Sequence, residues 1–401
     1  MSSIRKTDLS SYIPGMRKAG RKVSRSILAQ SFLGGLLLWL TASCSGFAEE
    51  PVAHGWKRQP FDFGAADLRG DIALPTDATL QSAPFQPRQA GTAGRTTVVG
   101  KVASSATVPA DVTVMIFDLE YPAVPLRVCA YEAQATGLDV VSQSVSDDLS
   151  SASLRSVEAK DGKFEQVTFT RCLTRGTKLI AFHFATKRAG MGEDAAVSAG
   201  ERIETFAATM LKGLTFADGK PASHWGGMTD IPLKLDTQSE VLKISPAWAV
   251  AINDFNGAVP AELHLVRKRD GKDAGLVWLG VFEAAANFDM TRDGEKLLRD
   301  FMEKQSPDFG EAKLLSNDRL VLPDGVAGQR NRFRFEIASK SGGKAGDVLS
   351  TVTRHGDRLH VVAWWSPPFS GDERARFMAR LPGFTAYDLA LDAMNRLMAA
   401  R

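Results

Sequence analysis

The chain has 401 residues, enough for two domains of ordinary size, and its 44% hydrophobic and 24% charged residues are typical of globular proteins rather than disordered or fibrous ones. The formal net charge of +3 comes from the N-terminus, because residues 1–48 hold seven Lys or Arg residues and one acidic residue. Without them, 42 basic and 45 acidic residues remain, with no basic block of the kind that indicates nucleic-acid binding.

Residues 1–48 have the three parts of an export signal. Five basic residues between Arg17 and Arg25 precede an uncharged run at 27–48, which is apolar and then rich in small residues. Three outcomes remain open: cleavage after Ala48, lipidation at Cys44, whose context Thr41-Ala-Ser-Cys44 resembles a lipobox, or retention as a membrane span of about 20 residues. The positive flank predicts that the rest is periplasmic, secreted, or anchored to the inner membrane and facing the periplasm.

Cysteine usage agrees with export. The cysteines after Cys44 are Cys129 and Cys172, and both lie in segments predicted to be strands, at 126–131 and 166–172. An oxidising compartment permits a disulfide between them. Two buried free thiols are the alternative.

Residues 49–95 are punctuated by Pro among Ala, Gly, Gln and Thr, which predicts a mostly irregular tether. A first domain is predicted at 96–216. Its expected strands lie at 97–102, 112–119, 126–131, 164–172 and 178–185, and its expected helices at 138–149 and 201–214. Turn and glycine signals at 217–240 predict a linker.

A second domain is predicted at 241–401. Its expected strands lie at 276–282, 332–337, 347–353 and 358–365, and its expected helices at 292–304, 373–384 and 389–398. Thr291 is the predicted N-cap of the first of these helices.

One strand–helix pair occurs twice, at 178–185 with 201–216 and at 358–365 with 373–384. Both helices begin with Glu-Arg and have a Phe within the next four residues, Phe206 and Phe377, which indicates two copies of one domain. Each strand contains a continuous apolar run, at 179–182 and 361–365, so both faces of each sheet should be covered. The predicted fold class is α+β: two tandem α/β/α sandwich domains, each a central, mainly antiparallel sheet with helices on both faces.

Two short motifs lie at opposite ends of the second copy. Ile244-Ser-Pro-Ala-Trp248 is the expected opening strand, and Leu381-Pro-Gly-Phe384 ends the helix after its hairpin. In this order they resemble the PsbP/DcrB-like family of extracytoplasmic lipoproteins and lumenal photosystem-associated proteins. The two copies would cover about 97–216 and 240–386. The resemblance implies an α/β/α sandwich that binds proteins or assists assemblies, and it transfers no catalytic residue.

Side chains suited to catalysis form no recognisable constellation in the sequence. The six histidines lack a spacing such as His-Glu-x-x-His, and a Gly-x-Ser-x-Gly elbow is missing, so no catalytic residue, metal or cofactor is predicted. In the repeat alignment His360 replaces Ile180 and His183 replaces Ala363, which favours packing roles. Asp289, Asp293 and Glu295 lie near a helix N-terminus, where acids complement the helix dipole; a calcium site is the alternative.

The predicted ligand- or partner-binding residues are Trp364, Trp365 and His360. Adjacent strand residues point to opposite faces, so both indoles can be buried in a two-sided sheet. The alternative is that one indole faces a groove and anchors a peptide or lipid.

These observations favour an exported, non-enzymatic envelope protein whose duplicated domains serve interaction with an unidentified envelope protein or assembly with it. Nucleic acid is not an expected partner. The alternative is a small-molecule binder or hydrolase with a site at the junction of the domains, where His224, Trp225 and Asp230 lie among glycines.

Overall fold

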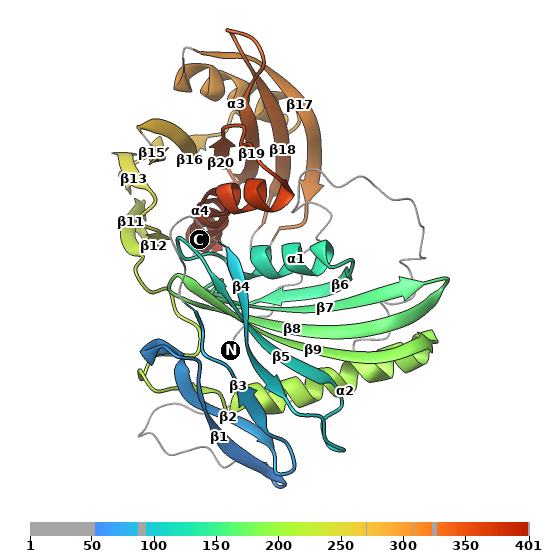
Figure 1. Cartoon of the computed structure of the whole chain (residues 1–401). Coiled ribbons are helices and arrows are strands. Elements are labelled where there is room, and N and C mark those ends of the chain that lie inside the picture. Colours follow the sequence, from blue (N-terminus) through green and yellow to red (C-terminus); the bar gives the residue numbers. More distant parts are fainter. Residues whose placement is uncertain (1–52, 87–93, 270, 307, 323–326, 400–401) are drawn as a thin grey trace.

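The computed structural model describes residues 53–86, 94–269, 271–306, 308–322 and 327–399, which form two antiparallel seven-stranded sheets and two small three-stranded sheets (Figure 1). The predicted leader and Cys44 lie outside the described residues. Among the helices of the described part, none is long and apolar enough to cross a bilayer.

The two large sheets have the same strand order. If the strands of each are counted along the chain, both sheets run 1-2-3-7-6-5-4. The first contains β3 (Leu80–Ser82), β4 (Arg95–Val102), β5 (Asp111–Asp118), β9 (Lys178–Met191), β8 (Lys163–Arg175), β7 (Ser151–Lys160) and β6 (Asp139–Val145). The second contains β13 (Ala249–Asn253), β15 (Ala261–Arg269), β16 (Lys272–Glu283), β20 (Arg358–Ser366), β19 (Lys344–His355), β18 (Gln329–Ser339) and β17 (Phe309–Leu320).

Each sheet carries a helix after its third strand and another after its seventh. These are α1 (Pro125–Ala135) and α2 (Glu193–Lys212) in the first domain, and α3 (Arg292–Gln305) and α4 (Glu373–Ala399) in the second. Along β9, Leu179 and Ala181 share a core with α1, whereas Ile180 and Phe182 share a core with α2. The two helices therefore cover opposite faces, and the predicted α/β/α sandwich is confirmed.

The repeated apolar strands are the central strands β9 and β20. Lys178 pairs with Asp118 and Arg358 pairs with Glu283, each at the end of the third strand of its sheet. Counted from these pairs, Ile180 of the first domain corresponds to His360 of the second. A continuous apolar sequence suits this central place, since both faces of the strand are buried.

The domains meet through α1 and α4. The Arg127 side chain of α1 donates to Asp388 of α4, and the Tyr131 ring stacks on Phe377 with centroids 4.0 Å apart. One apolar cluster runs from the α1 face of the first sheet to the α4 face of the second. The two domains thus share a continuous core, as the adjacent placement of α1 and α4 in Figure 1 suggests.

Two predicted elements have the wrong type. Residues 126–131, predicted as a strand, lie in α1, and residues 138–149, predicted as a helix, contain β6. The first segment is buried throughout, and such a short apolar run does not distinguish a helix from a strand. In the second segment, the apolar residues have helical spacing but do not form one buried face, because Val141 lies 46% exposed on an edge strand.

The predicted tether is also wrong where the structure describes it. Residues 56–75 form β1 (Trp56–Asp62), a 3-10 turn (Ala66–Leu68) and β2 (Arg69–Pro75), joined by β10 (Thr215–Phe216) into a small sheet. Phe61, Phe63 and Leu74 are buried in the α2 core. Apolar residues spaced among prolines and glycines therefore form an ordered layer rather than a spacer.

The predicted linker contains most of a hairpin. Residues 229–244 form β11 (Thr229–Leu235) and β12 (Gln238–Ile244), beside the short β14 (Asn256–Gly257). Ile231, Leu233 and Leu235 alternate along β11 and are buried in the core shared by the domains. Such a period-2 pattern is typical of a half-buried strand. In the sequence prediction, the glycine and turn signals beside it outweighed this pattern.

The predicted helices at 373–384 and 389–398 are one helix, α4, with Pro382 inside it. Proline removes a backbone donor and normally breaks a helix. Here Trp248 Nε1 donates to the Pro382 carbonyl at 3.3 Å, and Arg267 donates to the Ala379 carbonyl at 3.1 Å. These side chains supply partners to carbonyls around the proline, and burial of the helix against β20 holds its two halves together.

Candidate functional site

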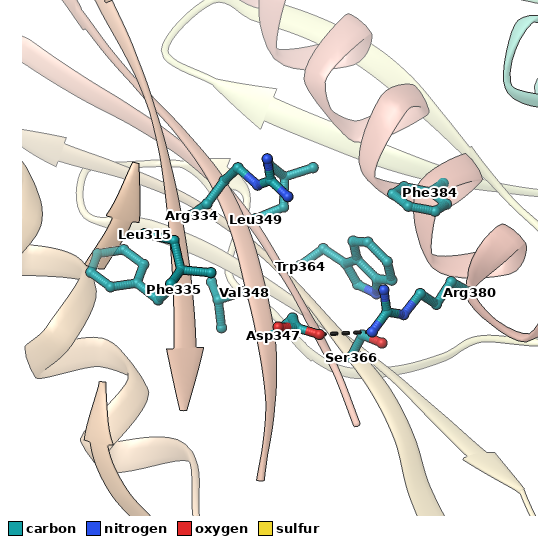
Figure 2. Close-up of a pocket in the computed structure, with 10 residues that line it drawn as sticks. All are labelled: Leu315, Arg334, Phe335, Asp347, Val348, Leu349, Trp364, Ser366, Arg380 and Phe384. Atoms are coloured by element: carbon teal, nitrogen blue, oxygen red, sulfur yellow. Dashed lines mark hydrogen bonds and ion pairs between the residues drawn. The ribbon is translucent and has the colours of Figure 1, made fainter. Parts of the chain in front are cut away.

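A groove of about 40 Å³ lies beside α4 on the second sheet (Figure 2). We call it the α4 groove. It is lined by Leu315, Arg334, Phe335, Asp347, Val348, Leu349, Trp364, Ser366, Arg380 and Phe384.

The sequence of β18 places arginines on the α4 side of the sheet. Phe333, Phe335 and Ile337 point into the α3 core, so the alternate residues Arg330, Arg332 and Arg334 point to the other face. Strand register sets Arg334 beside Leu349 of β19, and Leu349 beside Trp364 of β20. The floor of the groove is therefore a cross-strand row of a cation, an aliphatic side chain and an indole.

The next row carries the polar groups. Asp347 lies beside Glu336 and Ser366, and it accepts from Arg380 of α4 at 2.7 Å and from Lys344 at 2.6 Å. Lys344 also pairs with Glu336 at 3.0 Å. The two carboxylates of this row are therefore neutralised by neighbouring cations.

Arg334 differs from the arginines around it. Arg330 donates to Thr353 and Asn395, at 2.8 and 2.6 Å. Arg334 is half-buried, but among the described residues its guanidinium has neither a hydrogen bond nor an ion pair. Burial lowers the pKa of Arg334 from its usual value, although Asp318 and Asp347 act in the other direction.

Of the three predicted binding residues, only Trp364 lines the α4 groove. Its ring is buried 4.6 Å from that of Phe384. Trp365 faces the α3 side, 5.3 Å from the Phe309 ring, and lines a separate cavity of about 10 Å³. His360 is buried four residues earlier on β20. The structure therefore does not gather the three into one site.

Cys129 and Cys172 form a disulfide with an S–S distance of 1.95 Å. Cys129 lies on α1, not on a strand, and Cys172 lies on β8. The bond attaches the helix at the domain interface to the sheet beneath it.

The loop that leads out of the first domain is organised by Arg175, which is fully buried. Its guanidinium donates to the Asp67 and Pro221 carbonyls at 3.1 and 2.9 Å and to Asp218 at 2.6 Å, and it lies 3.7 Å from the centre of the Phe216 ring. Arg175 thus joins β8, the N-terminal strands and the junction loop.

Of the junction residues predicted for an alternative site, Trp225 and Asp230 have structural partners, whereas Nδ1 of His224 is buried without a hydrogen-bond partner in the described part of the chain. Trp225 Nε1 donates to the Asp148 carbonyl at 2.8 Å, and Asp230 pairs with Lys243 at 2.8 Å. Burial, with a smaller effect of nearby cations, lowers the pKa of His224. The three cavities characterised in the described part of the chain are lined by other residues.

The acidic cluster before α3 caps the helix. Asp289 Oδ1 accepts from the backbone of Thr291 and Arg292 at 2.9 and 2.7 Å, and Asp293 accepts in return from the Asp289 backbone at 2.9 Å. The Arg292 side chain lowers the pKa of Asp293 to about 2. Thr291, the predicted N-cap, makes no side-chain cap hydrogen bond. Across the ranges that the structure describes, no three His, Cys, Asp or Glu residues are grouped to hold a metal ion.

The outer strands of the two sheets differ in a way that the sequence reasoning missed. In the first sheet the Gln59 amide donates to the Leu80 carbonyl at 3.0 Å and accepts from the Leu80 N–H at 3.2 Å, so a side chain occupies the edge of β3. In the second sheet the corresponding strand, β13, has no described segment paired to its outer edge. All five residues of β13 are exposed, with Val250 at 46% and Ile252 at 41%.

Comparison with known proteins gave structural similarity alone. No protein-family model matches the chain, and no curated protein matches it. The Ran-binding protein Mog1p of Saccharomyces cerevisiae aligns with a TM-score of 0.28 and 14% identity, over 42% of this chain and 93% of that one.

Two further structures extend this comparison. CyanoP, the PsbP of Synechocystis sp. PCC 6803, aligns with a TM-score of 0.27 and 12% identity, over 37% of this chain and 85% of that one. The type VI secretion immunity protein TplEi of Pseudomonas aeruginosa aligns with a TM-score of 0.21 and 8% identity, over 85% of this chain and 97% of that one. Scores of this size assign neither a family nor a function.

Proposed function

We propose that this chain is an exported, non-enzymatic protein of the cell envelope that binds an extended segment of a partner polypeptide along β13. The observation that carries the proposal is the difference between the two corresponding edges. The first domain fills its edge with Gln59 and the N-terminal strands, whereas the second leaves β13 open in the described chain.

The chemistry of β13 favours an added strand. Edge strands are usually protected by charged residues or proline, and β17 at the opposite edge has Glu311, Lys313 and Asp318. The sequence of β13, Ala249-Val-Ala-Ile-Asn253, contains neither a charge nor a proline, although its pairing with β15 has one bulge. A partner strand would satisfy the free backbone groups and cover Val250 and Ile252.

Export is proposed from two independent features. Residues 1–48 have the form of a secretory leader, and the Cys129–Cys172 disulfide is of a kind that persists in oxidising compartments. Membership of the PsbP/DcrB-like family is proposed on the motifs around Trp248 and Pro382 and on the order of the sheets and helices. The junction residues Trp225 and Asp230 have structural partners, and none of the three characterised cavities is lined by His224, Trp225 or Asp230, so a hydrolase site there is not proposed.

Site-specific photo-crosslinking in intact cells tests the proposal. A benzophenone amino acid replaces Val250 in the full-length chain, and Val98, 44% exposed on the interior strand β4, is the matched control. We expect a discrete adduct at position 250, absent at position 98 and lost when Ile252→Lys is added. Equal labelling at both positions, or none at 250, would contradict strand addition. Envelope fractionation with sequencing of the mature N-terminus tests export separately.

A further inference from the structure

The α4 groove contains a cation that the described residues leave without a partner. Arg334 lies on the floor of the groove, half-buried and without a hydrogen bond or ion pair to any described residue. Partial burial costs a guanidinium part of its hydration, and Arg334 recovers this only through the more distant attraction of Asp318 and Asp347. An anion held at this point would recover that loss through a charge-assisted, two-point contact.

The charges around the groove favour an anion. On the α4 side of β18 and β19, with Arg380 of α4 and Asp318 of β17, the cations outnumber the carboxylates; the cations are Arg330, Arg332, Arg334, Lys344 and Arg380, and the carboxylates are Asp318, Glu336 and Asp347. Glu336 and Asp347 are engaged with Lys344 and Arg380. Asp318, opposite Arg332, receives a hydrogen bond from Ser316 at 3.1 Å. Arg334 is therefore the cation of the groove lining that has neither a hydrogen bond nor an ion pair with a described residue, although Asp318 and Asp347 attract it.

The rest of the groove is apolar. Leu349 separates Arg334 from Trp364 in one cross-strand row, and Phe384 packs against the Trp364 indole. Two strand spacings of about 4.8 Å set the backbones of Arg334 and Trp364 roughly 10 Å apart. Figure 2 shows Leu349 beside Arg334 and the Trp364 indole toward α4. A ligand anchored at Arg334 would thus lie over Leu349 with its far end at the aromatic pair.

We propose that the α4 groove binds a monocarboxylate with a short apolar body, its carboxylate on Arg334 and its apolar part along Leu349 toward Trp364 and Phe384. A groove of about 40 Å³ admits a few atoms, which suits a chain of about six carbons lying partly in solvent. The same chemistry is offered by a small free acid and by the C-terminus of a polypeptide with an apolar last residue. This site is separate from β13, so its existence does not depend on the function proposed above.

Calorimetric titration of the full chain tests the assignment with hexanoate and its uncharged analogue hexanamide. For a ligand of this size we expect a Kd of about 1 mM for hexanoate and no measurable binding of hexanamide. Arg334→Gln should raise the Kd for hexanoate at least about tenfold. Arg334→Lys keeps the charge but loses the two-point contact, so its Kd should lie between those of the wild type and Arg334→Gln. Arg319→Gln, at an exposed arginine on the neighbouring β17, should leave the Kd unchanged.

A second measurement separates binding from folding. Because Arg334 has no described partner, Arg334→Gln should leave Tm unchanged or raise it. Equal affinity for hexanoate and hexanamide, no binding of hexanoate, or equal losses in Arg334→Gln and Arg319→Gln would overturn the proposal. A tripeptide ending in Leu, as free acid and as amide, identifies the natural source of the carboxylate. If its free acid binds more tightly than hexanoate, the natural ligand is a polypeptide C-terminus. If it binds more weakly, the natural ligand is a small acid.

Discussion

Arg127 of the first domain donates hydrogen bonds from Nε and Nη2 to the two carboxylate oxygens of Asp388 in the second, at 2.7 and 2.6 Å. The Arg127 side chain is 4% exposed and that of Asp388 13%, so the pair is shielded from water. Removal of one member of such a pair leaves an uncompensated buried charge. The domain interface therefore depends on both residues together.

Asp388→Ala should lower the free energy of unfolding by about 3–5 kcal/mol, because Arg127 would then remain buried without its acceptor. Urea denaturation measures the change. Asp230→Ala is the matched control, since Asp230 pairs with Lys243 at 2.8 Å on an exposed hairpin and should contribute less than about 1 kcal/mol. A loss in Asp388→Ala no larger than that of the control would show that the interface does not rely on the pair.

Gly383→Ala should destabilise the protein by about 1–3 kcal/mol through overpacking. Gly383 faces the indole of Trp364 so closely that an added methyl group would overlap the ring. Gly192 has open space around its Cα and a φ of −71°, so Gly192→Ala should cost less than about 1 kcal/mol. Thermal unfolding of the two variants, with near-UV circular dichroism to follow the indole, distinguishes them; equal melting temperatures would refute the close contact.

Reduction of the disulfide should lower stability by about 4 kcal/mol in the loop-entropy model, since Cys129 and Cys172 are separated by 43 residues. Denaturation with and without dithiothreitol measures the difference. In Cys172→Ser the reductant should have no effect. If the wild-type chain is as stable reduced as oxidised, the bond does not restrict the unfolded chain as expected.

Stability should fall as the pH drops below 6.5. Burial lowers the pKa of His183 below its ordinary value of 6.5, so between the folded and the unfolded pKa the unfolded chain binds more protons. Stability is therefore fully present above pH 6.5 and is lost as the pH falls toward the folded pKa. Burial also lowers the pKa of His224, which contributes in the same direction.

His183→Ala tests this assignment, since Ala363 occupies the corresponding place in the second domain. The variant also loses the contact of His183 Nδ1 with Thr170 Oγ1 at 2.9 Å, which changes its stability at every pH. The comparison therefore uses the slope of the free energy of unfolding against pH. We expect a shallower slope between pH 6.5 and acid pH than in the wild type. An unchanged slope, also after His224→Ala is added, would assign the pH dependence to other groups.

The fold class could be predicted because its signal is local and repeated. A continuous apolar strand followed by a similar helix occurs twice, and only a sheet covered on both faces buries such strands. The sequence misled where a local pattern fits two structures. Residues 126–131 are short and apolar, and their helical form depends on burial against the first sheet and on Pro125 at the first helical position.

The candidate site could be predicted only in part. Trp364 was recognisable as an aromatic residue beside a loop, but the meaning of Arg334 depends on the register of three strands, which places it two strands from the indole. The open edge of β13 could not be predicted from the sequence either. It is recognised only by comparison with the corresponding strand of the first domain, β3, whose edge forms hydrogen bonds with the Gln59 side chain. Such relationships join residues far apart in sequence.

The helices at the domain interface are not equivalent members of the repeat. By position in the strand order, α1 corresponds to α3 and α4 corresponds to α2, so the contact is heterologous, as between successive units of a repeat array. Repetition of such a contact would use α2 of one chain and α3 of the next. The N-terminal strands cover the α2 end, where the Trp56 ring lies 5.3 Å from Phe206, and serve as the terminal cap of a two-unit stack. Deletion of residues 53–86 should therefore expose a surface suited to end-to-end association.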